Sequence, residues 1–412
     1  MKKSAENARR AAIVWSAIFA LSSVLASCGD SVQGKALPRM STVELEKLDF
    51  GIFPPEAHDY VFTTRRTSAD VYRIESRRML SYLVSPFEVD EDMSILESTR
   101  LLDVSPSTFD DDVLPTAFEP IAQQHHMFAG VSTRRSNGSL RAHKGMSIAI
   151  LRFPSDSAAQ AAADGFERIL DDTAPERRPL TIPGHADAKG SARDSKGYLF
   201  QSSGPYVIVS SLTWPEPDHQ AIAQTLASML DQQVPKVVAL KPTAPEDILD
   251  LPTNPEGILR LAVKSPKTSA TDLSSQNAAF KGGVFDAAGA RHFNVDAVRL
   301  ENVLTETGVD LVAHVEGTLY RTRDLEAAFH LQSTLAELGE LDHEIPGPPG
   351  ISDARCVSRD QYDPVFDTRT ECVIVRGRYV ARLISWGAAG GRIDPLLYQR
   401  TAAQYAILAK VE

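Results

Sequence analysis

The sequence has few cysteines and none of the short motifs that mark common catalytic sites. Only three of its 412 residues are cysteine, at positions 28, 356 and 372. It contains no Gly-x-Ser-x-Gly elbow, no His-Glu-x-x-His pair and no phosphate-binding loop. The sequence therefore assigns no reaction to this chain.

Positive charge and long apolar runs are also scarce. Asp and Glu outnumber Lys and Arg by 54 to 43, which gives a formal net charge of -11. Nucleic-acid binding depends on a basic surface, so no nucleic-acid partner is expected. The apolar run at 11–21 is shorter than the ~20 residues that span a bilayer. The overall composition, 43% hydrophobic and 24% charged, is that of a globular protein with more than one domain.

The N-terminus has the layout of a bacterial lipoprotein signal. Four basic residues precede the apolar run, and Leu-Ala-Ser-Cys follows it at 25–28. That tetrapeptide resembles a lipobox, in which the thiol of Cys28 is lipidated and the chain is cut before it. We expect a signal peptide at 1–27, a lipidated tether at 28–50 and a location at the cell membrane, on its extracytoplasmic face. The alternatives are a plain secretory signal with a chance cysteine and an uncleaved signal anchor.

The other two cysteines form an even pair in a chain with an export signal. Exported proteins meet oxidising conditions, so we predict a disulfide between Cys356 and Cys372. The connection between them is polar and contains the turn signal Asp363-Pro364. We interpret this disulfide as structural.

Two parts of the chain repeat one order of predicted elements: strand, helix, two strands, helix. The pattern of apolar residues predicts these elements at 146–153, 158–170, 197–200, 206–212 and 219–230, and again at 309–315, 325–338, 372–375, 379–384 and 396–408.

A shared motif lies between the helix and the two strands of each repeat. It reads Pro-Gly-x-x-Asp-Ala-basic-x-x-x-Arg-Asp at 183–194 and again at 349–360, and Trp214 and Trp386 follow at similar places. We predict an α+β fold of two tandemly duplicated domains, each an antiparallel sheet packed with helices. The predicted boundaries are 51–234 for the first domain, 235–257 for a Pro-rich linker and 258–412 for the second domain.

The charged residues that recur in this motif are candidate site residues: Asp187, Arg193, Asp353 and Arg359. One interpretation is a duplicated polar site. The other is structural, with Asp stabilising a turn and Arg pairing with a carboxylate. We favour the structural interpretation, because duplicated active sites usually diverge. No cofactor or metal is predicted.

The order of these features resembles a family of actinobacterial cell-envelope lipoproteins that is named only as a domain of unknown function. The resemblance rests on the lipobox, Arg77-Arg78-Met79-Leu80, the segment 85–90, the repeated motif and the paired-cysteine hairpin. It implies tandem α+β domains and supplies no catalytic residues. The repeated unit is also loosely similar to extracellular sensor domains of mycobacterial receptor kinases, which is an analogy of fold alone.

We therefore expect a non-enzymatic binding or assembly protein held in the membrane by its N-terminal lipid. Its partner would be an unknown envelope protein or a small ligand. The alternatives are an envelope hydrolase with an unrecognised site, and a lipid or glycolipid carrier, which would need a large apolar cavity.

Overall fold

The computed structural model describes residues 39–59, 68–105, 107–111, 113–264, 282–294, 297–300, 302–359, 368–387 and 393–411. The predicted signal peptide, Cys28 and the first part of the predicted tether lie outside these ranges. Within them, no helix is both long enough and apolar enough to cross a membrane.

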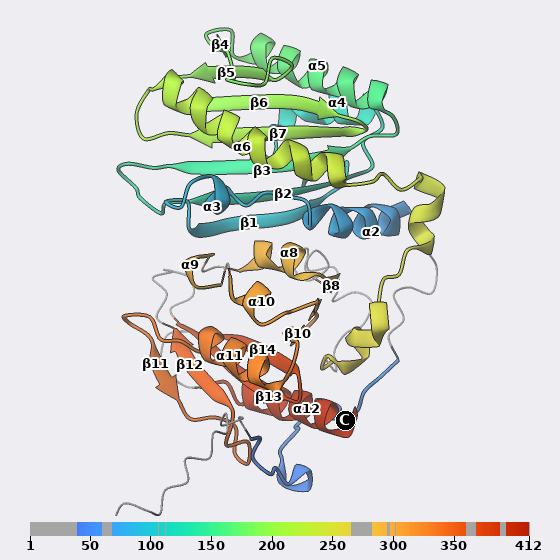
Figure 1. Cartoon of the computed structure of the whole chain (residues 1–412), viewed down its shortest axis with the longest axis vertical. Helices are drawn as coiled ribbons and strands as arrows, with labels where there is room; N and C mark the ends of the chain where they lie inside the picture. Colours follow the sequence, from blue (N-terminus) through green and yellow to red (C-terminus); the bar gives the residue numbers. More distant parts are fainter. Residues whose placement is uncertain are drawn as a thin grey trace, which may run out of the picture. The chain divides into compact units, whose positions relative to one another are not determined.

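The first domain contains a seven-stranded antiparallel sheet with the strand order β1-β2-β3-β7-β6-β5-β4 (Figure 1). Its strands are β1 (Ile95–Leu102), β2 (Ala129–Ser136), β3 (Gly145–Arg152), β4 (Arg178–Leu180), β5 (Lys189–Arg193), β6 (Lys196–Ser203) and β7 (Tyr206–Thr213).

The second domain repeats this sheet. Its strand order, β8-β9-β10-β14-β13-β12-β11, is that of the first sheet with each strand replaced by its counterpart. The predicted fold class is confirmed, and the shared topology is what a tandem duplication requires. The strands are β8 (Gly283–Phe285), β9 (Leu311–His314), β10 (Thr318–Arg321), β11 (His343–Ile345), β12 (Arg355–Arg359), β13 (Thr368–Arg376) and β14 (Tyr379–Gly387).

Helices cover the sheets and connect their strands. The α-helices are α2 (Ser68–Leu80), α3 (Pro86–Val89), α4 (Glu119–Gln124), α5 (Asp156–Thr173), α6 (His219–Ala239), α8 (Ala287–Ala290), α9 (Ala297–Leu300), α10 (Val303–Glu306), α11 (Leu325–Leu335) and α12 (Pro395–Val411). Short 3-10 helices are η1 (Leu45–Lys47), η2 (Thr116–Phe118), η3 (Pro245–Asp250), η4 (Pro255–Leu261) and η6 (Arg291–Phe293).

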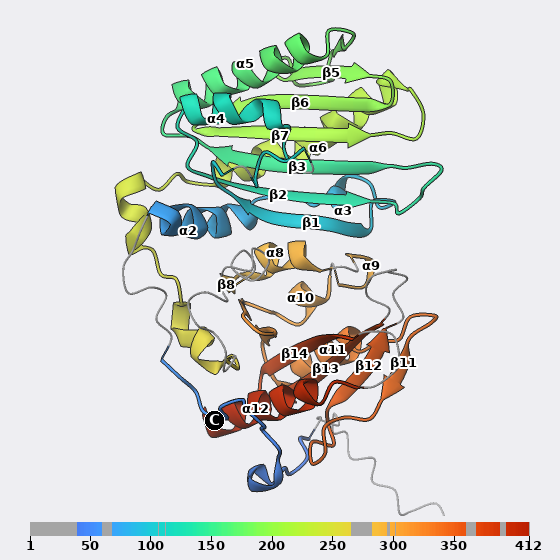
Figure 2. The same ribbon diagram turned by 180° about the vertical axis from the view of Figure 1, so that it is seen from behind.

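Strand β3 is the centre of the first domain, because both of its faces are buried. Ile148 and Ile150 belong to the core under α6, whereas Ala149 and Leu151 belong to the core under α5. Successive side chains of a strand point to opposite faces, so a continuous apolar run suits a strand covered on both sides. Figure 1 shows α6 over one face, and Figure 2 shows α4 and α5 over the other.

The predicted linker at 235–257 is more regular than its proline content suggests. Helix α6 continues past the predicted end at 230, through Pro235, to Ala239. Pro235 lies on the exposed side, whereas Val237 and Leu240 are buried and hold the last turn in place. Helices η3 and η4 follow, so packing outweighs the helix-breaking effect of proline here.

The repeated Pro-Gly motif builds the same two turns in both domains. In each copy the residue after glycine donates its N–H to the carbonyl three residues back, at 3.1 Å in the first and 3.2 Å in the second. Gly184 has φ 79° and Gly350 has φ 89°, values that suit glycine after proline in a type II turn. A second turn then leads into β5 or β12. The motif therefore has a structural role in both domains.

The structure contains the disulfide between Cys356 and Cys372. The two residues lie directly opposite each other on β12 and β13, with their Cα atoms 4.1 Å apart. Both are buried against the core beneath α12. On the chain-entropy estimate, closing a loop of about 15 residues stabilises the fold by roughly 3 kcal/mol. The turn signal Asp363-Pro364 lies outside the described residues.

Part of the segment predicted as a tether packs on the second domain. Leu48 and Phe53 are buried in the core beneath α12. The backbone N–H and the hydroxyl of Ser41 each donate to the carboxylate of Asp353, both at 2.6 Å. The chain from about residue 40 therefore belongs to the folded body.

Candidate functional site

On the α5 side of the first sheet, the side chains change from apolar to polar along the central strands. On β7, Val207 and Val209 belong to the core under α5, whereas Ser211 and Thr213 lie beyond it. Helices α4 and α5 cover only one end of this face (Figure 2). The polar residues of the other end are Arg134, Ser147, Lys196, Tyr198, Ser211 and Thr213.

The strand register places four of these side chains, together with Ser191, in one row across the sheet. Arg134 on β2 is opposite Ser147 on β3, which is opposite Ser211 on β7. Ser211 is in turn opposite Tyr198 on β6, and Tyr198 is opposite Ser191 on β5. Directly opposed residues point to the same face with Cβ atoms about 4.5–5.5 Å apart, so the row forms one continuous surface.

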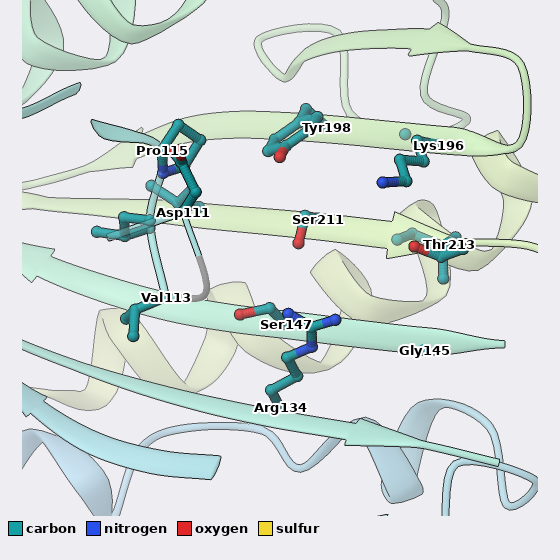
Figure 3. A pocket seen from close by; sticks show the side chains of 14 residues that line it. Asp111, Val113, Pro115, Arg134, Gly145, Ser147, Lys196, Tyr198, Ser211 and Thr213 are labelled. Atoms are coloured by element: carbon teal, nitrogen blue, oxygen red, sulfur yellow. The ribbon is translucent and has the colours of Figure 1, made fainter. Parts of the chain in front are cut away.

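A second row and a loop complete a small pocket. Thr213 is opposite both Gly145 and Lys196, at the strand ends. Asp111, Val113, Leu114 and Pro115 form the wall at the other end, and Ser147 and Ser211 lie between (Figure 3). The pocket encloses about 100 Å³, roughly the volume of three waters at ~30 Å³ each.

The hydroxyl groups of this pocket are available for a ligand. Those of Ser147, Tyr198, Ser211 and Thr213 have no side-chain hydrogen bond to any described residue. Buried Ser210, on the opposite face of β7, donates its hydroxyl to the carbonyl of Ser147 at 3.0 Å. On β7, the hydroxyl that bonds within the protein, that of Ser210, therefore lies on the opposite face from the hydroxyls of Ser211 and Thr213, which are available to a ligand.

Cationic groups surround Tyr198. The guanidinium of Arg177 lies 5.0 Å from the Tyr198 ring centroid and donates to the hydroxyl and the carbonyl of Ser191, at 3.0 and 2.6 Å. Arg134 forms an ion pair with Glu97 at 2.6 Å. Burial raises the pKa of Tyr198, although Arg177 opposes this effect. The phenol is therefore protonated at neutral pH and can donate a hydrogen bond.

Lys196 has no ion pair with any residue in the described part of the chain. Its side chain is exposed at the start of β6 and contributes to the pocket lining (Figure 3). An unpaired ammonium group beside available hydroxyls gives the pocket a positive end.

The second domain has a different arrangement on the equivalent face. Ser191 and Val357 have the same place in the repeated motif. Ser191 is opposite Tyr198, and Val357 is opposite Glu371. Glu371 therefore stands at the position of Tyr198. Unlike Tyr198, its side chain is fully buried.

Three arginines surround the Glu371 carboxylate. Arg359 donates its Nε–H to one oxygen, and Arg382 donates from Nε at 2.9 Å and Nη2 at 2.5 Å to the other. Arg369, the counterpart of Lys196 by register, has its Nε 3.7 Å from Glu371. The equivalent face of the second domain thus holds an internal carboxylate among cations.

The first copy of the candidate polar residues lies apart from the pocket centre. Asp187 is exposed in the second turn of the motif. Arg193 is opposite Lys196 in the ladder and pairs with Glu176, with Asp194 3.8 Å away. Arg193 therefore stands at the edge of the pocket face.

The second copy has internal partners. The carboxylate of Asp353 binds Ser41, and Arg359 pairs with Asp342 at 2.7 Å as well as with Glu371. In the part of the chain that the structure describes, no ion pair joins Asp187 to Arg193 or Asp353 to Arg359.

The sequence alone does not single out the pocket residues. Ser147, Tyr198 and Ser211 fall within the predicted strands 146–153, 197–200 and 206–212. The sequence does contain one relevant signal. Each of these apolar strands has a polar end, and a polar end indicates a part of the sheet face that no helix covers. Across the described ranges, no group of three or more His, Cys, Asp or Glu residues is placed to hold a metal ion.

Comparisons with known proteins identify a family without a known activity. The N-terminal part of the domain of unknown function DUF7373 matches residues 62–253, and its C-terminal part matches residues 258–411. No curated protein matches the chain significantly. The extracellular domain of PknH from Mycobacterium tuberculosis is 14% identical, with a TM-score of 0.28 over 38% of this chain and 96% of that chain. A similarity at this TM-score supports no inference. The predicted membership of a family of unknown function is confirmed: the chain belongs to the DUF7373 family.

Proposed function

We propose that this protein is a non-enzymatic lipoprotein of the cell envelope that binds a polar ligand in the pocket of its first domain. The observation that carries the proposal is the set of available hydroxyls beside Lys196, facing one hollow. A sheet face whose hydroxyls have no hydrogen bond within the protein is suited to an external partner.

The proposed location rests on the N-terminal sequence and the disulfide. The signal layout with the lipobox ending at Cys28 directs the chain across the cytoplasmic membrane and anchors it on the outer face. The bond between Cys356 and Cys372 is of the kind that forms and persists in oxidising compartments.

The pocket chemistry favours binding over hydrolysis. A serine nucleophile needs a base within hydrogen-bond reach. Ser147 and Ser211 have no such hydrogen bond in the described structure, and the histidine nearest the pocket, His143, packs over Gly145 without a hydrogen bond to either serine. These residues can orient a bound group but have no evident means of activating one another.

A variant that fills the pocket tests this proposal. We expect Ser211→Trp to remove the components that the chain from residue 29 captures from envelope extract, because the indole occupies the hollow between β3 and β6. Mass spectrometry of captured proteins, lipids and small molecules provides the measurement. Ser333→Trp, at an exposed position on α11, is the matched control and should capture as the unsubstituted chain does.

Circular dichroism and thermal unfolding establish that both variants are folded. Equal recovery with Ser211→Trp and Ser333→Trp, or no specific recovery with any form, contradicts binding at this pocket.

A further inference from the structure

We infer that the ligand of this pocket presents an oxyanion, such as a phosphate, sulfate or carboxylate group, to Lys196 and the surrounding hydroxyls. The inference rests on the proposed function and names the chemistry of the same site. It follows from the size of the pocket, its donors and the comparison between the two domains.

The size of the pocket suits a charged group and not an entire ligand. Sites for drug-sized molecules enclose roughly 300–1,000 Å³, whereas this pocket encloses about 100 Å³. That space accommodates the few heavy atoms of an oxyanion, and the remainder of a larger ligand would lie on the open sheet face.

The polar groups of the pocket include a suitable set of donors. Ser147, Ser211 and Thr213 each supply one O–H, and the ammonium of Lys196 supplies up to three N–H groups. A tyrosine, whose ordinary pKa is about 10, is protonated at neutral pH, and burial raises the pKa of Tyr198 further, so it is a further donor. Hydrogen bonds between such donors and an ionised acceptor are stronger than neutral ones.

The one carboxylate in the pocket wall has a local partner. Asp111 Oδ1 accepts the backbone N–H of Thr116 at 2.6 Å, within its own loop. Asp111 is exposed at the end of the pocket away from Lys196 and Thr213 (Figure 3). An oxyanion at the lysine end would therefore be separated from this negative charge.

The second domain supports the same chemistry from within the molecule. There, Glu371 occupies the position of Tyr198, and its carboxylate is bound by Arg359 and Arg382. This face of the fold thus accommodates a carboxylate among cations when the chain supplies one. In the first domain the equivalent position is a tyrosine, which leaves the anion to be supplied by a ligand.

The test is titration calorimetry at constant ionic strength, using the chain from residue 29, which contains every described element. Inorganic phosphate, sulfate and acetate are the anionic probes, and glucose is the neutral probe. We expect at least one anion to bind, glucose not to bind, and Lys196→Gln to weaken the anion about tenfold or more. Lys241→Gln, an exposed lysine after α6, is the matched control and should leave the affinity unchanged.

A vesicle arm separates the two sources of a phosphate group. Binding to phosphatidylinositol vesicles but not to phosphatidylcholine vesicles, with loss in Lys196→Gln, identifies a lipid headgroup. Binding of soluble anions without vesicle binding identifies a free anion. Either result supports the inference.

These experiments distinguish failure of the oxyanion assignment from failure of the proposed function. If neither a soluble anion nor phosphatidylinositol vesicles bind, or if Lys196→Gln binds them as the unsubstituted chain does, the oxyanion assignment is wrong. Should glucose then bind and be lost in Ser211→Trp, the pocket remains the binding site with a neutral ligand. Anion binding that survives both Lys196→Gln and Ser211→Trp lies elsewhere and counts against the proposed function as well.

Discussion

Replacing Glu371 with alanine is expected to lower the free energy of unfolding by about 3–5 kcal/mol. The side chain is fully buried and interacts with Arg359, Arg369 and Arg382. Removing the carboxylate leaves these guanidinium groups without their shared counter-charge in a region that excludes water. Breaking a buried ion pair in this way costs far more than losing a surface pair.

Urea denaturation of Glu371→Ala provides the measurement. Glu344→Ala is the matched control, because Glu344 is exposed on β11 and pairs with Arg355 at 3.3 Å. An exposed pair contributes at most about 1 kcal/mol. Equal losses in the two variants contradict the structural role that the buried cluster has in this fold.

The surroundings of Glu371 also predict that the stability of the protein depends on pH. Burial alone would raise the pKa of Glu371, but the charges of Arg382, Arg369 and Arg359 outweigh it and hold the pKa below its usual value. A carboxyl whose pKa is lowered by folding contributes its stability above the unfolded pKa of about 4.3. The stability difference between the unsubstituted chain and Glu371→Gln should therefore shrink as the pH falls below that value and through the lower folded pKa.

Cys28→Ala is expected to abolish lipid attachment completely. The thiol of this residue is the proposed attachment point, and alanine has no nucleophile to receive an acyl-bearing group. Each buried methylene contributes about 0.8 kcal/mol to membrane binding, so two or three acyl chains make a stable anchor. The variant should also retain residues 1–27, because processing depends on the same cysteine.

Labelling of cells with radioactive palmitate, followed by electrophoresis, tests both effects. The variant should carry no label and should migrate more slowly than the processed protein. The double variant Cys356→Ser/Cys372→Ser controls for general loss of thiols and should keep its label. A Cys28→Ala protein with the label and mobility of the unsubstituted protein contradicts the lipobox interpretation.

The elements that sequence patterns predict best carry a regular run or stripe of apolar residues. Strand β3 contains the apolar run 148–151, which is buried on both faces, and helix α5 has one apolar face after its N-cap serine, Ser155, whose hydroxyl accepts from Ala158 at 3.2 Å. Strands β1 and β2 were missed. They carry several polar side chains, and Arg135 on β2 is almost fully buried, which composition alone does not predict.

The sequence does not reveal the candidate site, for a different reason. Arg134, Ser147, Tyr198 and Ser211 are distant in sequence and meet only through the register of four strands. A register is fixed by long-range pairing, and a shift of one residue would turn each side chain to the opposite face. The repeated motif was detectable because it is local, but it encodes turns.

The central claim is that the polar end of the first sheet binds an anionic group. Nuclear magnetic resonance of the isotope-labelled chain from residue 29, titrated with inorganic phosphate, locates the contact residue by residue. We predict that the largest shifts occur at Gly145, Ser147, Lys196, Ser211 and Thr213. Shifts that avoid these residues and concentrate in the second sheet, or no saturable shifts at all, would contradict the claim.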